Sequence, residues 1–269
     1  MISFPNAKIN IGLNVVERRN DGFHNIETLF YPVYQLYDVL EIIETEEVSL
    51  SVFGTDISEN IEDNLIIRAY RLLQADYSLP ALAFYLKKAI PIGAGLGGGS
   101  ADAAFTLKML NDMFCLKIPN KKLENYAVKL GADCPFFIEN KPSMAQSKGE
   151  VLTEIDINLK GKFLLLVKPD IYINTAEAYA NIIPHKPEYN LQTIINKPIS
   201  EWKNFIFNDF EDVIFNKYPL LHEIKKIMYG FGAVYASMSG SGSTIYGIFN
   251  QYPKNIANFE NYYVKIVDL

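Results

Sequence analysis

A glycine-rich segment at residues 91–104, PIGAGLGGGSADAA, contains the residue types that most clearly indicate chemistry. Five glycines lie between Pro91 and Ser100. Glycine reaches positive φ without a Cβ, so its backbone N–H groups can close around an anion. Ser100 is expected to cap the following helix and to direct its positive dipole end at the same anion. A flexible loop is the alternative, but mobile linkers are usually polar. The segment therefore predicts a phosphate-binding loop.

Three common kinds of phosphate loop do not fit this segment. Gly93 and Gly98 have the spacing of a Walker loop, but Gly99 follows where that loop needs lysine. Gly93, Gly95 and Gly98 spell G-x-G-x-x-G, yet a dinucleotide fold would place an acidic residue about 20 positions further on, after a second strand. The sequence there reads as a helix. A protein-kinase glycine loop precedes a strand, whereas SADAAFTLKML also reads as a helix.

Other segments could bring polar groups to such a site. In AKINIGLNVV the residues alternate with period two, which places Lys8 and Asn10 on the polar face of a strand. A helix stop followed by a helix start at 131–135 leaves Asp133 on a tight turn that exposes its carboxylate. A second glycine loop, SMSGSGST at 237–244, lies between two expected strands, and a plain hairpin turn is an equal alternative for it.

Length and composition limit the class of protein. The chain has 269 residues, 49% hydrophobic and 21% charged, which fits one large or two modest globular domains. A net charge of −6 and a pI near 5.2, with no long basic run, argue against a nucleic-acid partner. No apolar stretch approaches the roughly 20 residues of a membrane helix, and the amino terminus lacks the order of a signal peptide. The two cysteines show no metal spacing, so we expect a reduced, cytoplasmic protein without a membrane partner.

The remaining pattern predicts an α+β protein. Strands are expected over the first quarter of the chain, and Asn64 is expected to open an amphipathic helix. Helices should follow the glycine loop at about 100–114 and 120–130. A boundary near 155–161 precedes a β-α-α-β-β-α-β order, typical of a small helix-covered antiparallel sheet. Beyond it, further helices and strands are expected at about 175–182, 208–215, 219–230, 233–237, 244–249 and 261–268.

Four motifs resemble those of the small-molecule kinases of the galactokinase, homoserine kinase, mevalonate kinase and phosphomevalonate kinase superfamily. They are PNAKINIGL, PIGAGLGGGSADAA, GADCPFF and MSGSGST, in this order. Within the superfamily, AKINIGLNV followed by RRNDGFHNIETLF resembles the family that phosphorylates 4-diphosphocytidyl-2-C-methyl-D-erythritol in the non-mevalonate isoprenoid pathway. NLIIRA at 64–69 and NTAEAY at 174–179 fit the same family more loosely.

The resemblance implies a fold and a reaction. Residues 1–157 would form an ATP-binding α+β domain of the ribosomal-protein-S5-domain-2 type, and residues 158–269 a ferredoxin-like domain that contributes to the substrate cleft. The implied reaction is transfer of the γ-phosphoryl group of ATP to the 2-hydroxyl of the cytidyl-diphospho sugar alcohol. Mg²⁺ would accompany ATP, and no dedicated protein metal site is expected. The partner is a small molecule, and the chain is expected to be a monomer or a weak homodimer.

The resemblance also assigns a catalytic pair and an ATP site. Phosphoryl transfer needs a carboxylate at the attacking hydroxyl, positive charge near the transferred group and oriented amides on the phosphates. By the resemblance, Asp133 takes the hydroxyl proton and Lys8 lies beside it. A helix cap and a solvated strand face are the structural alternatives for these two residues. The residues expected to bind ATP are Asn64, Pro91, Gly93, Ala94, Gly95, Leu96, Gly97, Gly98, Gly99 and Ser100.

The acceptor site is assigned in the same way. His24 matches a position that contacts the cytosine end of the substrate, and Tyr179 matches an aromatic that stacks on cytosine. A surface histidine and core packing are the alternatives. The chain departs from the family at Phe23, where Tyr is usual, at Ala101, where Ser is common, and at Ser147, where Gly is common. These departures bear on affinity more than on reaction type. The residues expected to bind the acceptor are Asn10, Phe23, His24, Thr175, Tyr179 and Gly240.

Other functions remain open at this point. The ATP loop does not identify the acceptor, so another kinase of the superfamily, of the homoserine or mevalonate kinase type, is the first alternative. A non-catalytic nucleotide-binding module is the second, although the presence of Lys8 and Asp133 weighs against it. A Rossmann-type oxidoreductase is a distant third. Cys134 is expected to be a packing residue, because no His or Asn pattern supports a nucleophile. The sequence assigns neither the magnesium ligands nor the adenine pocket.

Overall fold

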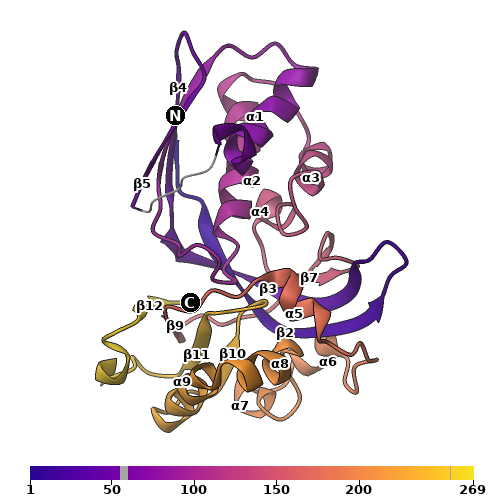
Figure 1. Ribbon diagram of the computed structural model, residues 1–269, viewed down its shortest axis with the longest axis vertical. Coiled ribbons are helices and arrows are strands. Elements are labelled where there is room, and N and C mark those ends of the chain that lie inside the picture. Colours follow the sequence, from indigo (N-terminus) through magenta and orange to yellow (C-terminus); the bar gives the residue numbers. More distant parts are fainter. Residues whose placement is uncertain (55–59, 255) are drawn as a thin grey trace. The chain divides into compact units, whose positions relative to one another are not determined.

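Helices and strands are mixed along the chain, as the sequence pattern predicts, and the α+β class is confirmed (Figure 1). The computed structural model describes residues 1–54, 60–254 and 256–269. These residues form two units, each assembled from segments that are distant in sequence. The first unit contains Met1–Lys8, Pro32–Ile92 and Gly97–Lys141, and the second contains Ile9–Tyr31, Gly93–Leu96 and Pro142–Leu269. The domain division expected at residue 157 stays a prediction.

The first unit is built on a four-stranded sheet of order β1-β4-β6-β5. β4 pairs antiparallel with β1 and β6, whereas β5 runs parallel to β6. Along β6, Phe84 and Leu86 are buried while Tyr85 between them is exposed, so one face of the sheet is covered. The elements of this unit are β1 (Ile2–Ser3), β4 (Val39–Glu44), β5 (Ser49–Phe53), β6 (Leu82–Lys87), the 3₁₀ turn η1 (Ile61–Asp63), α1 (Leu65–Asp76), α2 (Gly98–Met113), α3 (Asn120–Val128) and α4 (Phe136–Glu139).

The starts of the helices α1 and α2 differ in kind. The side-chain oxygen of Asn64 accepts a hydrogen bond from the N–H of Ile66 at 3.0 Å, so the prediction that Asn64 opens this helix is confirmed. The predicted cap at Ser100 is wrong. α2 begins at Gly98, and its N-cap is Gly97, whose φ is +72° and which makes no side-chain cap. Ser100 lies inside the first turn, because the helix starts directly after the last left-handed glycine.

The second unit contains two further sheets, of orders β2-β3-β7-β8 and β10-β11-β9-β12. All pairings in the latter sheet are antiparallel. The strands are β2 (Asn6–Arg18) and β3 (His24–Tyr37), whose ends belong to the first unit, and β7 (Ser143–Gln146), β8 (Val151–Glu154), β9 (Phe163–Lys168), β10 (Tyr235–Met238), β11 (Ile245–Phe249) and β12 (Tyr263–Asp268). The helices are α5 (Thr175–Ala180), α6 (Leu191–Ile194), α7 (Ile199–Trp202), α8 (Phe210–Lys217), α9 (Pro219–Gly230) and the 3₁₀ turn η2 (Ile256–Phe259).

Helix α9 shows how the sequence pattern produces the core of the second unit. Pro219 occupies the first helical position, where its missing N–H costs nothing. Leu221, Ile224 and Met228 follow at helical spacing, and all three are buried in one cluster with β-strand residues such as Leu165. The predicted helix at 219–230 is confirmed. Figure 1 shows α8 and α9 beside β10 and β11.

Candidate active site

The two predicted catalytic residues, Lys8 and Asp133, form an ion pair within the first unit. Lys8 belongs to β2, and Asp133 lies in the turn between α3 and α4. Lys8 Nζ is 3.3 Å from Asp133 Oδ2, and the two side chains are 3% and 34% exposed. The strand face at Lys8 is therefore not solvated. A buried ammonium is held against a carboxylate that remains accessible, which brings a proton acceptor and a positive charge to one place.

Cys134, next to the catalytic candidate Asp133, is a buried thiol. Burial raises the pKa of the Cys134 thiol to about 12, although a hydrogen bond with Ser100 opposes the shift. The nucleophile of thiol chemistry is the thiolate, so at neutral pH this group is unreactive. This agrees with its prediction as a packing residue.

In the first glycine loop, glycines with left-handed backbone conformation alternate with other residues. Gly93, Gly95 and Gly97 have φ values of +62°, +73° and +72°, which side chains rarely adopt. Gly98 then begins α2, and the first N–H groups of a helix have no partner inside it. Within the first unit, a Cβ at Gly97 would lie 3.0 Å from Lys8 Cγ. The start of α2 is therefore beside the Lys8 side chain, and the loop can present amides to an anion there.

The side chains of the other predicted ATP-binding residues lie in different surroundings. Ala94 and Leu96 are 2% and 1% exposed, so they can contribute only backbone groups to a ligand. Pro91 is partly exposed. Asn64 uses its side-chain oxygen to cap α1, as described above. Contacts of these residues with ATP stay predictions.

A buried ion network that sequence analysis missed holds the start of the glycine loop. Lys88 Nζ forms ion pairs with Asp38 and, at 2.8 Å, with Asp102 in α2. Asp38 Oδ1 also accepts the N–H groups of Ala89 and Ile90 at 2.6 and 2.9 Å. The chain entering the loop and the first turns of α2 are thus tied to one buried cluster in the first unit. The available signal was an aspartate in an otherwise small and apolar helix start, SADAA.

The network contains two carboxylates for one ammonium, and this imbalance affects Asp102. Asp102 is 3% exposed, and its Oδ1 has no hydrogen-bond partner among residues 1–54, 60–254 and 256–269. Burial raises the pKa of the Asp102 carboxyl to about 7, and the nearby Asp38 adds to the shift while Lys88 opposes it. Below that pH a proton on Asp102 leaves a neutral pair of Lys88 and Asp38.

We expect Asp102→Asn to change how stability depends on pH. A folded-state pKa above the ordinary value of 3.8 contributes stability that is present at low pH and lost as pH rises through about 7. The amide cannot ionise, so the variant should gain stability relative to the wild type as pH rises from 3.8 to about 7, by at most about 1.4 kcal/mol per pH unit for one proton, and the difference should be constant above that range. Urea unfolding across this range measures the difference. Asp112→Asn, exposed on the same helix, is the control, and a difference independent of pH would contradict the prediction.

In the second unit, Asn10 and the two glycine loops are joined through Ser239. The N–H of Asn10 donates to Ser239 Oγ at 3.2 Å, and Ser239 Oγ donates to the carbonyl of Gly95 at 2.8 Å. The N–H of Thr244 also donates to the carbonyl of Ala94 at 3.3 Å. The predicted acceptor residue Asn10 is 2% exposed and bonds Thr28 Oγ1 at 3.0 Å. The structure thus brings both glycine-rich segments and Asn10 together.

The second glycine loop connects the antiparallel strands β10 and β11, so it is a hairpin, and it also packs on the first loop. Gly240 and Gly242 have φ values of +56° and +94°. A Cβ at Gly240 would lie 3.4 Å from Asn10 Oδ1. The predicted acceptor residue Thr175, at the start of α5, places its Oγ1 3.2 Å from Ser241 Oγ. Three of the predicted acceptor residues therefore lie around this hairpin.

The predicted cytosine contacts, His24 and Tyr179, stack on each other. Their ring centroids are 4.9 Å apart with an interplanar angle of 17°, and Tyr179 also meets Phe210 edge-on at 4.8 Å. Burial, with a contribution from Arg18, lowers the pKa of His24 below its ordinary value of 6.5. The imidazole is therefore mostly neutral at pH 7 and can both donate and accept a hydrogen bond.

The three departures from the family pattern have different surroundings. Phe23 is 59% exposed, and Lys148 Nζ lies 5.0 Å from its ring centroid. Ser147 has a φ of +62°, which explains why glycine suits this position, and its hydroxyl accepts from Arg19 at 3.2 Å. Ala101 is fully buried in α2. These residues do not interrupt the Lys8–Asp133 pair.

Among the described ranges, no group of three or more His, Cys, Asp or Glu side chains is arranged to hold a metal ion. No helix in the described part of the chain combines the length and the apolarity needed to cross a membrane.

Two family models match the chain. The GHMP kinases N terminal domain matches residues 64–141, which include the first glycine loop and Asp133. The GHMP kinases C terminal model matches residues 191–263, which include the second glycine loop.

Known proteins are similar to nearly the whole chain. A 4-diphosphocytidyl-2-C-methyl-D-erythritol kinase from Bacteroides fragilis is 52% identical over 254 residues, covering 93% of this chain and 92% of its own. A crystal structure of 4-(cytidine 5'-diphospho)-2C-methyl-D-erythritol kinase matches with a TM-score of 0.79 and 31% identity, over 92% of this chain and 90% of that one. A homoserine kinase from Cytophaga hutchinsonii matches with a TM-score of 0.62 at 17% identity, which is a likeness of fold alone.

Proposed function

The chain belongs to the family of 4-diphosphocytidyl-2-C-methyl-D-erythritol kinases, and from this premise we propose that it transfers the γ-phosphoryl group of ATP to the 2-hydroxyl of 4-diphosphocytidyl-2-C-methyl-D-erythritol. This reaction belongs to the non-mevalonate route to isoprenoid precursors. The observation that carries the chemistry is the ion pair of Lys8 and Asp133 beside the start of α2. The identity of the acceptor is supported by the 52% identical relative.

Each part of the proposed site has one task. Asp133 accepts the proton of the 2-hydroxyl as its oxygen forms a bond to the γ-phosphorus, while the bond from that phosphorus to the β-phosphate oxygen breaks and ADP leaves. Lys8 places positive charge near the developing phosphoryl oxygens. The amides of residues 93–100 and the start of α2 hold the triphosphate. Asn64 and Pro91 would contact the nucleotide.

Mg²⁺ enters this proposal together with ATP. In proteins Mg²⁺ is usually held by one or two carboxylates together with substrate phosphates, and it neutralises charge on the transferred group. The described residues offer no cage of several metal-ligating side chains, so the triphosphate would supply much of its coordination. The chain's own steps, proton uptake by Asp133 and charge stabilisation by Lys8, do not depend on which residues complete that shell.

For the acceptor we assign the cytidyl end to the aromatic residues and the sugar alcohol to the hairpin. His24 and Tyr179 stack on each other, and rings of this kind can take up a cytosine ring by stacking. Phe23, which directly precedes His24 in sequence, is exposed and can offer a further aromatic face. Asn10, Thr175 and Gly240 lie around the hairpin between β10 and β11 and would contact the rest of the acceptor.

The finer fold labels belong to the same proposal. One sheet of the second unit has the strand order β12-β9-β11-β10, which is 4-1-3-2 when β9, β10, β11 and β12 are counted in chain order, and every pairing in this sheet is antiparallel. This order, with α8 and α9 between β9 and β10, supports a ferredoxin-like carboxyl-terminal domain. The mixed sheet of the first unit, with the parallel pair β5 and β6, is compatible with an S5-domain-2-like domain.

The remaining expectations about partners are also proposals. The net charge of −6 supports a small-molecule partner rather than a nucleic acid. We propose a cytoplasmic enzyme that acts as a monomer or a weak homodimer and needs no membrane partner.

The acceptor is tested by comparing substrates. An ADP-release assay with ATP and Mg²⁺ should give turnover with the cytidyl acceptor and none above background with homoserine or mevalonate. In the same assay we expect Tyr179→Ala to raise the acceptor KM by roughly 5- to 150-fold, which corresponds to the 1–3 kcal/mol of a stacked base, and to leave the KM for ATP nearly unchanged. Tyr252→Ala, at an exposed aromatic, is the control. Equal turnover of an acceptor without the cytidyl group would contradict the assignment.

A further inference from the structure

The segment FNDFE at 207–211, just before and at the start of α8, has no role in the proposed reaction, yet its polar residues Asn208 and Glu211 are buried. Asn208 is 3% exposed. Its Nδ2 donates hydrogen bonds to the carbonyls of Met238 and Gly240, both at 2.8 Å. Its Oδ1 accepts the N–H of Phe210 at 3.0 Å. Every hydrogen-bonding group of this side-chain amide except one acceptor position is therefore used inside the second unit.

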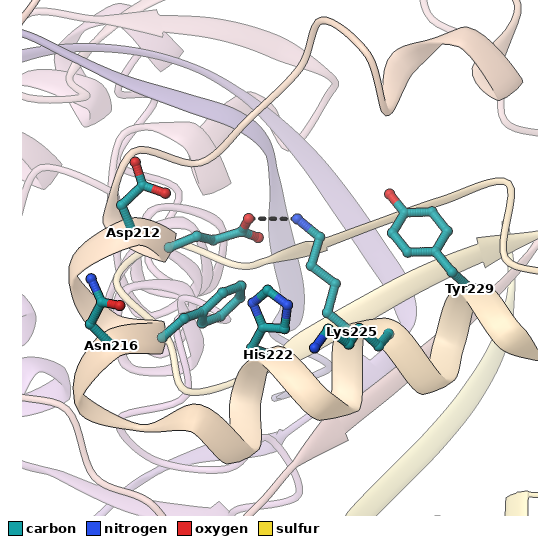
Figure 2. A pocket seen from close by; sticks show the side chains of 8 residues that line it. Asp212, Asn216, His222, Lys225 and Tyr229 are labelled. Atoms are coloured by element: carbon teal, nitrogen blue, oxygen red, sulfur yellow. Dashed lines mark hydrogen bonds and ion pairs between the residues drawn. The ribbon is translucent and has the colours of Figure 1, made fainter.

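Glu211 reinforces the same attachment. It is 7% exposed, and its Oε1 accepts the N–H of Met238 at 2.7 Å and the hydroxyl of Ser237 at 3.1 Å. Its Oε2 pairs with Lys225 Nζ at 2.5 Å. Both residues line a surface pocket between α8 and α9, in which Figure 2 labels Lys225. The side-chain amide of Asn208 thus holds the second glycine loop. The carboxylate of Glu211 holds β10, the strand that leads into this loop.

The same segment is fixed to β2 on its other side. The N–H of Leu13 donates to the carbonyl of Phe207, and the N–H of Asp209 donates to the carbonyl of Leu13, both at 2.9 Å. The N–H of Val15 donates to Asp209 Oδ2 at 2.7 Å. Residues 207–211 therefore connect the strand that carries Asn10 with the hairpin that contacts Asn10.

We propose that Asn208 is a positioning residue for phosphoryl transfer, which sets the shape of the second glycine loop and its register against Asn10 and Gly95. The two carbonyls that Asn208 binds flank Ser239, whose hydroxyl joins Asn10 to Gly95. One side-chain nitrogen that donates to both carbonyls fixes the Met238–Ser239 and Gly240–Ser241 peptide groups, which enclose the Ser239–Gly240 peptide. A carboxylate has the same shape but no N–H, so it would repel both carbonyl oxygens.

This inference rests on the proposed function, because its readout is turnover of the cytidyl acceptor. Asn208→Asp should lower kcat/KM for that acceptor at least about tenfold, with a rise in KM, because the buried carbonyls lose their donors and the loop shifts. Thermal unfolding should still show one cooperative transition. Asn216→Asp is the matched control: the same substitution at an exposed position of α8, expected to keep kcat and KM at wild-type values.

The outcomes separate this inference from the proposed function. A wild-type enzyme without activity on the cytidyl acceptor would refute the proposed function. If the wild type is active, two results for Asn208→Asp would overturn the positioning role. One is an unchanged KM for the acceptor, and the other is a kcat reduced only in proportion to the folded fraction of the variant. If Asn208→Asp does not fold, Ser239→Ala decides, because it removes the hydroxyl between Asn10 and Gly95 without altering Asn208. A rise in acceptor KM supports the role, and normal kinetics in Ser239→Ala overturn it.

Discussion

Asp133→Asn should lower kcat by about 10²- to 10⁴-fold, the range attributed to general acid–base catalysis. Asn has the shape of Asp but cannot accept the proton of the attacking hydroxyl. KM for ATP and for the acceptor should change far less, because the substitution removes an interaction that matters in the transition state. Steady-state kinetics with the cytidyl acceptor measure both quantities.

Controls for this prediction come from the ion pair itself and from the same unit. Asp112→Asn repeats the substitution at an exposed carboxylate and should keep wild-type kcat. Lys8→Ala should also lose turnover, since it removes the positive charge 3.3 Å from Asp133. Because both residues act on one hydroxyl, the double variant should be little worse than the poorer single variant. Near-normal kcat in Asp133→Asn, or fully multiplicative losses, would return Asp133 to a structural role.

The sequence predicted those features that depend on local pattern. Helix α9 was predicted at its observed bounds, Pro219–Gly230, because a proline start and a regular apolar spacing both mark it. The α+β class and the family followed from motifs of several residues each. The short helices α6 and α7 were not predicted, because segments of four residues carry too little periodicity to be seen.

The start of α2 was misplaced because glycines look alike in a sequence. The five glycines of the loop divide into three with left-handed φ and two that are already helical, and only the structure shows that Gly97 is the last of the first kind. Serine is a better cap than glycine in general, which favoured Ser100. At this position the left-handed backbone conformation of Gly97 determines where α2 begins.

The supporting polar networks could not be predicted because their members are far apart in sequence. Asp38 and Asp102 are 50 and 14 positions from Lys88, and Asn208 lies 30 and 32 positions from the carbonyls it binds. No local pattern links such residues. Their residue types alone suggested surface positions, since Lys, Asp and Asn are mostly exposed in proteins. Burial reverses that expectation for all of them.

Gly95→Ala should remove most ATP turnover, lowering kcat/KM for ATP at least about 10²-fold, the cost of a displacement of about 1 Å at a reacting group. A Cβ at Gly95 would lie 2.0 Å from the carbonyl oxygen of Ser239 and 3.1 Å from that of Gly242. Both neighbours are backbone atoms, so no side-chain rotation relieves the clash. The φ of +73° adds strain for any residue other than glycine. The two glycine loops must therefore separate, and the amides on the triphosphate move with them.

Two other glycines, one distant and one in the same loop, make this prediction specific. Gly230→Ala, at the end of α9, should leave the kinetics unchanged, because beyond its own helix no atom of the described residues lies within 4 Å of the added Cβ. Gly99→Ala lies in the same loop, but its Cβ would meet only Leu65 Cδ1 at 3.7 Å and its φ is not left-handed. Its effect on the KM for ATP should therefore be far smaller than that of Gly95→Ala. A folded Gly95→Ala protein with wild-type KM and kcat would show that contact between the loops is not needed for ATP binding. Equal losses in Gly95→Ala and Gly99→Ala would instead point to the glycine amides themselves.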